Sequence, residues 1–104
     1  MNHLIKKFVN EVKNQYENKI YKTILFGSYA RGDNRADSDI DMLIIWEGNR
    51  SKKKKKIEDI AFDYLLEEGL YFSIKVLNTQ QYNELKEKGS PFIENIEKEG
   101  VLFE

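Results

Sequence analysis

The sequence of 104 residues contains 17 Lys and Arg against 18 Asp and Glu, a formal net charge of −1 at pH 7. This balance argues against bulk binding of nucleic acid, which usually needs a strong basic excess, and leaves room only for a local patch. Cysteine is absent and His3 is the single histidine. The composition therefore excludes disulfides and thiolate zinc sites, and it argues against Ser–His catalysis.

The apolar runs are too short to cross a membrane. The longest, such as the run from Met42 to Trp46, fall far below the ~20 residues that span a bilayer. The N-terminal residues also lack the apolar stretch of a signal peptide. We therefore expect a cytoplasmic protein without membrane association, and its length fits one domain over residues 1–104.

The first half of the chain is expected to form one helix and two strands. Apolar residues recur at helical spacing over residues 2–18. Residues 22–27 are a short β-prone run that ends in glycine, and a polar stretch rich in turn formers follows at 32–38. Residues 40–46 form the second strand, which is nearly all apolar after Asp41, as expected for a covered central strand.

The second half is expected to form three helices and two strands, which makes the whole an α/β domain. Thr79 is predicted to cap one helix and Gly89 to end it, and proline at the first position favours the start of the next helix. The expected elements are a helix at 51–68, a strand at 71–77, a helix from Thr79 to Gly89, a helix from Ser90-Pro91 and a terminal edge strand at Val101–Phe103.

Two carboxylates at the start of the second strand suggest a metal site. Asp39 and Asp41 are two positions apart, so in a strand their side chains face the same side with Cα atoms about 6.6 Å apart. Ile40 then faces the opposite side and can enter the core. Two carboxylates at this separation can converge on one Mg²⁺, which takes its remaining ligands from water and phosphates. Without a cation, the two like charges would repel.

The end of the first strand suggests a phosphate contact. Glycine at position 27 lets the backbone approach a phosphate closely, and a helical turn starting at Ser28 would present N–H groups and a hydroxyl to it. Arg31 could add positive charge to that contact, although an arginine in such a position more often forms a salt bridge with a neighbouring residue. No Walker lysine and no dinucleotide-binding glycine motif is present.

The arrangement Gly27-Ser28, ten residues, then Asp39-Ile40-Asp41 resembles the signature of the polymerase-β-like nucleotidyltransferase superfamily. Residues 27–32 and 38–41 closely resemble its minimal prokaryotic branch, the minimal nucleotidyltransferases. The resemblance implies a single mixed sheet with helices mainly on one face, a metal on Asp39 and Asp41, and triphosphate contacts from Gly27 and Ser28. Members of this branch are often antitoxins encoded beside HEPN-domain toxins, and some adenylylate a tyrosine of the toxin with ATP.

One position departs from the family pattern. The superfamily usually has a third carboxylate on the next central strand, where it acts as the base for the incoming hydroxyl. Here that strand, residues 71–77, contains no acid. Alternation along the strand puts Ser73 and Lys75 on its polar face, and Ser73 is the residue expected at the vacant catalytic position.

Three functions remain open from the sequence. The first is a Mg²⁺-dependent adenylyl or other nucleotidyl transferase acting on a protein hydroxyl, such as a tyrosine of a HEPN-type toxin. The second is a nucleotide-binding module that neutralises its partner by contact alone, which the missing third acid favours. The third is an RNA-directed transferase. Its support is a lysine run that is otherwise a solvated helix start, formed by Lys52, Lys53, Lys54, Lys55 and Lys56.

Overall fold

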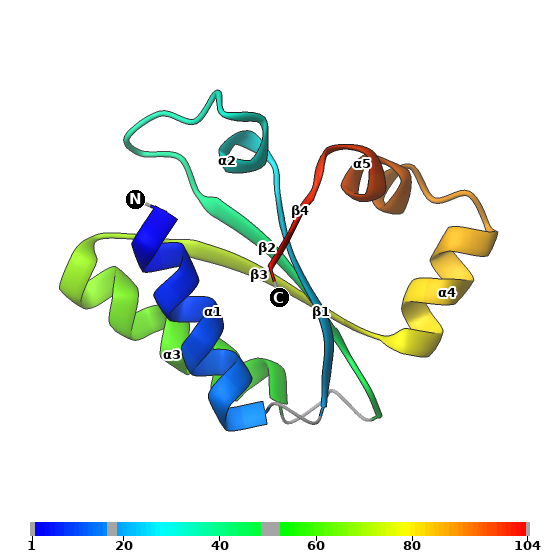
Figure 1. Ribbon diagram of the computed structural model, residues 1–104, viewed down its shortest axis with the longest axis horizontal. Coiled ribbons are helices and arrows are strands. Elements are labelled where there is room, and N and C mark those ends of the chain that lie inside the picture. Colours follow the sequence, from blue (N-terminus) through cyan, green and yellow to red (C-terminus); the bar gives the residue numbers. More distant parts are fainter. Residues whose placement is uncertain (1, 17–18, 49–52, 104) are drawn as a thin grey trace.

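The computed structural model describes residues 2–16, 19–48 and 53–103 (Figure 1). None of the helices in these ranges is long and apolar enough to cross a membrane. The helices are α1 (Asn2–Tyr16), α2 (Ser28–Arg31), α3 (Lys53–Glu68), α4 (Thr79–Glu87) and α5 (Pro91–Glu99). The strands are β1 (Ile20–Phe26), β2 (Ile40–Trp46), β3 (Phe72–Asn78) and β4 (Val101–Phe103).

The four strands form one mixed sheet in the order β3-β2-β1-β4. β1 runs antiparallel to both β2 and β4, whereas β2 and β3 are parallel and are joined by the crossover helix α3. Strand β1 starts at Ile20, two residues earlier than the sequence predicted, because a register irregularity between Ile20 and Lys22 lets the pairing continue to Trp46. The predicted terminal edge strand is confirmed as β4.

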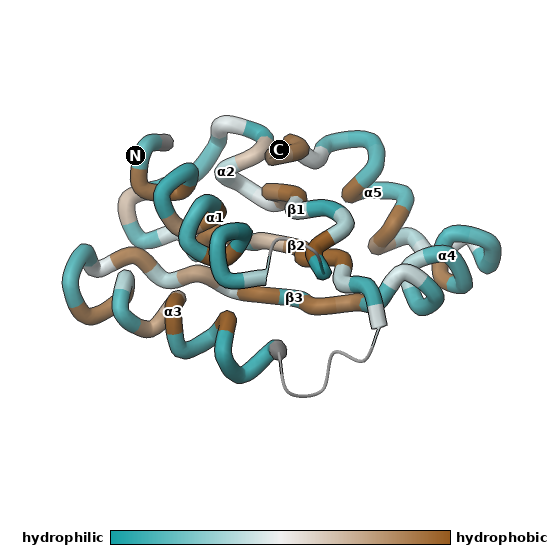
Figure 2. The backbone as a smooth tube through the Cα atoms, turned by 60° about the horizontal axis from the view of Figure 1, so that its bottom comes forward, coloured by the Kyte–Doolittle hydropathy of each residue, from teal (hydrophilic) through white to brown (hydrophobic). Residues whose placement is uncertain are grey.

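Alternating residues of β2 supply two separate cores. Ile40, Met42 and Ile44 enter the larger core, which α1 and α3 cover, whereas Leu43 and Ile45 enter a smaller core beneath α4 and α5. This explains why the strand reads as nearly continuous apolar sequence. In Figure 2, β3 is largely brown, the colour of hydrophobic residues, whereas the helices beside it are teal, the colour of hydrophilic residues, over much of their length.

The expected mixed sheet is confirmed, but the helices are divided between its faces more evenly than expected. α1 and α3 lie on one side and α4 and α5 on the other (Figure 1). Helical periodicity predicts that Ile93 and Ile96 are buried, as the structure confirms. The periodicity does not reveal which face of the sheet these residues pack against. The larger core nevertheless belongs to the face that α1 and α3 cover.

An aromatic cluster holds α1 against α3 and the sheet. The Phe8 ring stacks on the Phe72 ring with centroids 4.1 Å apart, and it meets the Tyr64 ring edge-on at 5.6 Å. The Tyr64 hydroxyl donates a hydrogen bond of 2.7 Å to Glu11 of α1. Aromatic pairs of this kind add roughly 0.5–1.5 kcal/mol each beyond the burial of their area, so this cluster fixes the orientation of α1.

The helices on the other face are capped and cross-linked by polar side chains. Asn78, rather than the predicted Thr79, caps α4 by accepting a hydrogen bond of 2.7 Å from the backbone N–H of Gln81. The prediction was wrong by one residue, because Thr79 is itself the first residue of the helix. The Tyr82 hydroxyl donates to Glu97 at 3.0 Å, which ties α4 to α5.

Candidate active site

A tight turn connects β1 to the short helix α2. Gly27 has a φ of 75° and a ψ of −155°, a conformation that is almost restricted to glycine. Its carbonyl accepts hydrogen bonds of 3.1 Å from the backbone N–H groups of Ala30 and Arg31. The helical turn that the sequence placed at Ser28 is therefore present, and it ends at Gly32, which is in the left-handed conformation.

Gly27 lies directly against the Asp41 side chain. The pairing of β1 with β2 places Phe26 opposite Asp41, so the residue after the strand end reaches the carboxyl group. A Cβ built on Gly27 would lie 3.1 Å from Asp41 Cγ and would collide with Asp41 Oδ2. The turn after β1 and the carboxylate on the neighbouring strand β2 are thus in contact. Only a glycine at position 27 leaves room for the carboxyl group where it is.

The two predicted carboxylates are near each other at the start of β2. Asp41 is the second residue of the strand and is half-buried, and exposed Asp39 directly precedes the strand. Burial is the main cause that raises the pKa of the Asp41 carboxyl, and the charge of Asp39 raises it further. Ile40 between them is fully buried on the opposite face, which agrees with the alternation expected from the sequence.

The pair has the chemistry of a Mg²⁺ site with several open positions. Carboxylate oxygens are hard ligands, and Mg²⁺ in phosphate-binding sites commonly uses one or two of them and completes its octahedron with water and phosphate oxygens. Within the described ranges no group of three or more acidic, histidine or cysteine side chains is placed to hold a metal. Asp39 and Asp41 by themselves could hold a Mg²⁺ ion only together with ligands from water or a substrate.

Ser73 occupies the position beside Asp41 on the next strand. The parallel pairing of β2 with β3 aligns Asp41 with Ser73 and Leu43 with Lys75, so Ser73 and Lys75 face the same side as Asp41. Ser73 is half-buried and Lys75 is exposed. Lys75 lowers the pKa of Asp41 against the larger effects of burial and Asp39. The sequence placed Lys75 on this polar face but assigned it no role at the site.

Arg31 lies within ion-pair distance of two carboxylates. Its Nε lies 3.2 Å from Asp33 Oδ2 and its Nη1 lies 3.6 Å from Glu99 Oε2. The hydrogen bond to Asp33 is the main cause that raises the pKa of the guanidinium group. Asp33 is a sequence neighbour, but Glu99 belongs to the end of α5, and the motif alone gave no signal of that contact.

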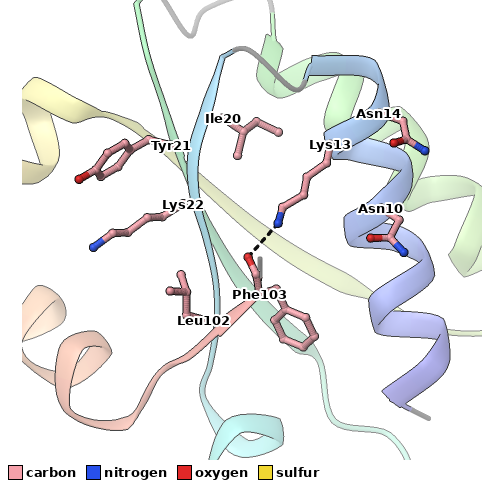
Figure 3. Close-up of a pocket in the computed structure, with 8 residues that line it drawn as sticks. All are labelled: Asn10, Lys13, Asn14, Ile20, Tyr21, Lys22, Leu102 and Phe103. Atoms are coloured by element: carbon pink, nitrogen blue, oxygen red, sulfur yellow. Dashed lines mark hydrogen bonds between the residues drawn. The ribbon is translucent and has the colours of Figure 1, made fainter.

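Two open grooves lie away from the carboxylates. One of about 550 Å³ is bounded by α1, the start of β1 and β4, where Lys13 donates a hydrogen bond of 3.1 Å to the carbonyl of Phe103 (Figure 3). A second, of about 630 Å³, continues along α1 to Tyr29. Neither groove is lined by Gly27, Asp39 or Asp41. Both border α1, whereas Asp41 faces the side that α4 and α5 cover.

The described part of the lysine run lies at the other end of the sheet from Asp41. Lys52 lies outside the described residues, and Lys54 to Lys56 belong to the first turns of α3. Helix α3 follows the C-terminal end of β2, so it starts near the opposite end of that strand from Asp41. Figure 1 shows α2, which follows the turn beside Asp41, at one end of the sheet and the start of α3 at the other. Lys55 forms an ion pair of 3.6 Å with Asp59 of the same helix.

The chain belongs to the nucleotidyltransferase domain family, whose model matches residues 5–103. It is 35% identical over 99 residues to a predicted protein adenylyltransferase of Methanocaldococcus jannaschii, with 94% of this chain and 93% of that protein covered. A second predicted protein adenylyltransferase of the same organism is 46% identical over 63 residues, which are 61% of this chain and 51% of that protein. The chain thus matches about half of one relative and nearly all of the other.

Two solved structures share the fold. The crystal structure of a predicted nucleotidyltransferase from Sulfolobus solfataricus superposes on this chain with a TM-score of 0.57 at 26% sequence identity. The superposition covers 99% of this chain and 78% of the S. solfataricus chain. A toxin–antitoxin structure determined with AMP-PNP has a TM-score of 0.58 at 13% identity, and covers 93% of this chain and 70% of that one. The second similarity concerns the fold alone.

Proposed function

We propose that this protein is a Mg²⁺-dependent nucleotidyltransferase that transfers AMP from ATP to a protein hydroxyl, namely a tyrosine of a HEPN-type toxin for which it is the antitoxin. The observation that carries the proposal is the contact between Gly27 and the Asp41 carboxyl. It joins an open backbone turn suited to phosphate with a carboxylate pair suited to a divalent ion. Membership of the nucleotidyltransferase domain family supports the same reaction class.

The proposed reaction is a displacement at the α-phosphorus of ATP. The oxygen of the acceptor hydroxyl forms a bond to this phosphorus while the bond from phosphorus to the oxygen bridging toward the β-phosphate breaks. The leaving pyrophosphate keeps that electron pair, and the hydroxyl proton passes to water. Catalysis of this kind depends mainly on positioning and on stabilisation of charge.

Each of the site residues has a role in this proposal. Asp39 and Asp41 would hold Mg²⁺, which supplies Lewis-acid stabilisation of phosphate charge when it is bound. Gly27 presents backbone without a side chain to the triphosphate, and Ser28 offers its hydroxyl. Arg31 would contact the nucleotide by exchanging its exposed ion pairs with Asp33 and Glu99 for a phosphate group. Exposed pairs of this kind are weak, so the exchange costs little.

The absence of a third carboxylate favours a tyrosine as the acceptor. Ser73, which the register places beside Asp41, cannot accept the proton of the attacking hydroxyl as a carboxylate does. A tyrosine hydroxyl has a pKa of about 10, so it loses its proton with less help than an aliphatic or ribose hydroxyl. The names of the M. jannaschii relatives, predicted protein adenylyltransferases, support a protein acceptor, and the toxin–antitoxin structure with AMP-PNP supports a toxin as the partner.

The test is intact mass spectrometry of a HEPN-type partner after incubation with ATP and Mg²⁺. The wild-type protein should add one or more adenylyl groups to a tyrosine, and Asp41→Asn should bind the partner in a pull-down but add nothing. Ser73→Asp should retain or raise the rate, because it introduces a base beside Asp41. An unmodified partner after incubation with wild-type protein at saturating ATP would contradict the proposal.

The second candidate function is a binding module that neutralises its partner without turnover. Ser73 in place of an acid favours it, as does the engagement of Arg31 by Asp33 and Glu99. The same experiment separates the two. A binding module neutralises the partner equally well as the wild type and as Asp41→Asn, and it leaves the partner's mass unchanged in both cases.

A further inference from the structure

The charges around the candidate site do not by themselves suit a triphosphate. ATP carries several negative charges, and Asp39 and Asp41 add two more when both are ionised. Charges a few ångströms apart interact strongly near a protein surface, where the effective dielectric constant is about 20. One divalent ion offsets only part of this repulsion. A site for ATP therefore needs a further cation that faces the two carboxylates.

Arg31 can supply only part of this charge, and only after its guanidinium group gives up its ion pairs with Asp33 and Glu99. Lys75 differs in this respect. It takes part in none of the ion pairs formed by the described residues, and its side chain is exposed. The ammonium group is a compact charge on a flexible four-carbon stem, and it can approach a ligand without giving up any of these ion pairs.

The strand register directs Lys75 toward the site. Asp41 is aligned with Ser73, and Lys75 is two positions further along the same strand, aligned with Leu43. Residues two apart on a strand face the same side about 6.6 Å apart, and neighbouring strands are about 4.8 Å apart. Ser73 is small, so nothing bulky at that position of β3 separates the Lys75 stem from the space above Asp41. The influence of Lys75 on the Asp41 carboxyl agrees with this proximity.

We propose that Lys75 binds the phosphate groups of the nucleotide, as a contact outside the Gly-Ser and Asp-x-Asp motif. The inference rests on the proposed function, because it presumes that a nucleoside triphosphate occupies this site. In this proposal β3 is part of the nucleotide site because it contributes the Lys75 cation, although Ser73 on the same strand contributes no carboxylate. The alternative role for Lys75 is that of a charged residue on an outer strand, where lysines discourage edge-to-edge aggregation.

The experiment is titration calorimetry of ATP in the presence of Mg²⁺. Lys75→Met should lower the affinity about tenfold or more, as expected for loss of a charge-assisted contact. Lys75→Arg should stay within about threefold of wild type, because it keeps the charge. Lys88→Met is the matched control: this exposed lysine is the C-cap residue of α4, in the turn that leads to α5, and its replacement should leave the affinity unchanged.

Two further measurements distinguish phosphate binding from a general effect. The loss in Lys75→Met should be smaller for AMP than for ATP, and the dependence of ATP affinity on salt should be weaker in the variant, since screening acts on the lost charge. Equal ATP affinity of Lys75→Met and wild type would overturn the inference and leave the proposed function standing. Absence of ATP binding by the wild type would overturn both.

Discussion

Gly27 meets two separate requirements at one position. Its φ of 75° and ψ of −155° lie in a region that side chains rarely adopt, and its missing Cβ leaves the space that the Asp41 carboxyl fills. The first requirement concerns the backbone, and the second concerns the site. Gly32 shares only the first: its φ is 82°, but an added Cβ would meet nothing within 4 Å.

This difference between the two glycines predicts different effects of the same substitution. Gly27→Ala should destabilise the protein by about 1–3 kcal/mol through backbone strain, and it should also reduce ATP binding at least tenfold because Asp41 must move. Gly32→Ala should lower the melting temperature but leave ATP affinity near that of the wild type. Parallel thermal melts and calorimetry of both variants check this. Equal loss of ATP affinity in the two variants would mean that strain alone is responsible.

The Asp41 carboxyl is predicted to cost stability at neutral pH in the absence of a divalent ion. Burial and Asp39 raise its pKa above the ordinary value of 3.8, so the folded protein binds the proton more tightly than the unfolded chain does. Its contribution to stability is therefore present at low pH and is lost as the pH rises through the raised pKa. Asp41→Asn should have a higher melting temperature than wild type at pH 7 in EDTA.

That gain should vanish near pH 3, where the carboxyl group is protonated in both the folded and the unfolded chain. Asp63→Asn, a change at an exposed position of α3, is the control and should lack this difference between pH values. Thermal melts from pH 3 to pH 8 provide the measurement. A lower melting temperature of Asp41→Asn across the whole range would contradict the assignment of burial as the dominant effect.

The residues of the candidate site were partly accessible from the sequence. Gly27 before a short helix, and Asp39 and Asp41 on the same side of a strand start, are local features. Their spacing in the sequence was therefore enough to predict where they would lie. The Arg31–Glu99 pair joins residues 68 positions apart (99 − 31), and no local pattern reports it. Lys75 stands out only once the parallel register with β2 aligns it beside Leu43.

Helix α3 carries charge of opposite sign at its two ends. Lys54 to Lys56 lie in its first turns, and Glu67 and Glu68 close it. The positive end is near the C-terminus of β2 and therefore away from Asp41. Lysines at a helix start also oppose the helix dipole by a few tenths of a kcal/mol each at an exposed position.

Replacing the lysine run, Lys52 to Lys56, with glutamine is therefore predicted to leave ATP affinity unchanged. The melting temperature should stay the same or rise slightly, since the unfavourable interaction with the dipole is removed. Calorimetry with ATP and a thermal melt of the variant are sufficient to check this. A large loss of ATP affinity would place these lysines in the nucleotide site, whereas loss of RNA binding alone would support a basic patch.

The elements themselves were largely predictable, but their partners were not. Apolar periodicity located α1 and α3, and Pro91 located the start of α5, because these signals lie within a few residues. The pairing of β4 with β1 brings residues 101–103 beside residues 23–25, and it depends on the fold of everything between them. The assignment of α4 and α5 to the second face depends on such long-range contacts too.

At the scale of the whole molecule, β2 joins the two cores. Ile44 and Ile45 are adjacent in the chain and fully buried, yet they enter cores on opposite faces of the sheet. The two cores cannot lose their packing independently, because both depend on the same strand. We therefore expect a single cooperative unfolding transition, as is usual for chains of this size.

The matched variants Ile44→Val and Ile45→Val test this expectation. Each should lower the free energy of unfolding by about 0.5–1.5 kcal/mol, the usual range for a buried Ile→Val change. Trp46 fluorescence reports on the larger core and far-UV circular dichroism on all helices, and in both variants the two signals should give the same midpoint. A transition of α4 and α5 at lower denaturant in Ile45→Val, with Trp46 unaffected, would show that the faces unfold separately.

The contact between Gly27 and Asp41 also has a consequence for how such a gene can diverge. A single codon change at position 27 would displace the carboxyl group and silence turnover, while the two cores that hold the sheet together remain intact. A lineage selected only for neutralising its partner by contact would be under pressure to reject such a change only through the cost of backbone strain, a cost that also applies at Gly32. Retention of Gly27 in descendants that have lost Gly32 would therefore be a record of selection for chemistry rather than for binding.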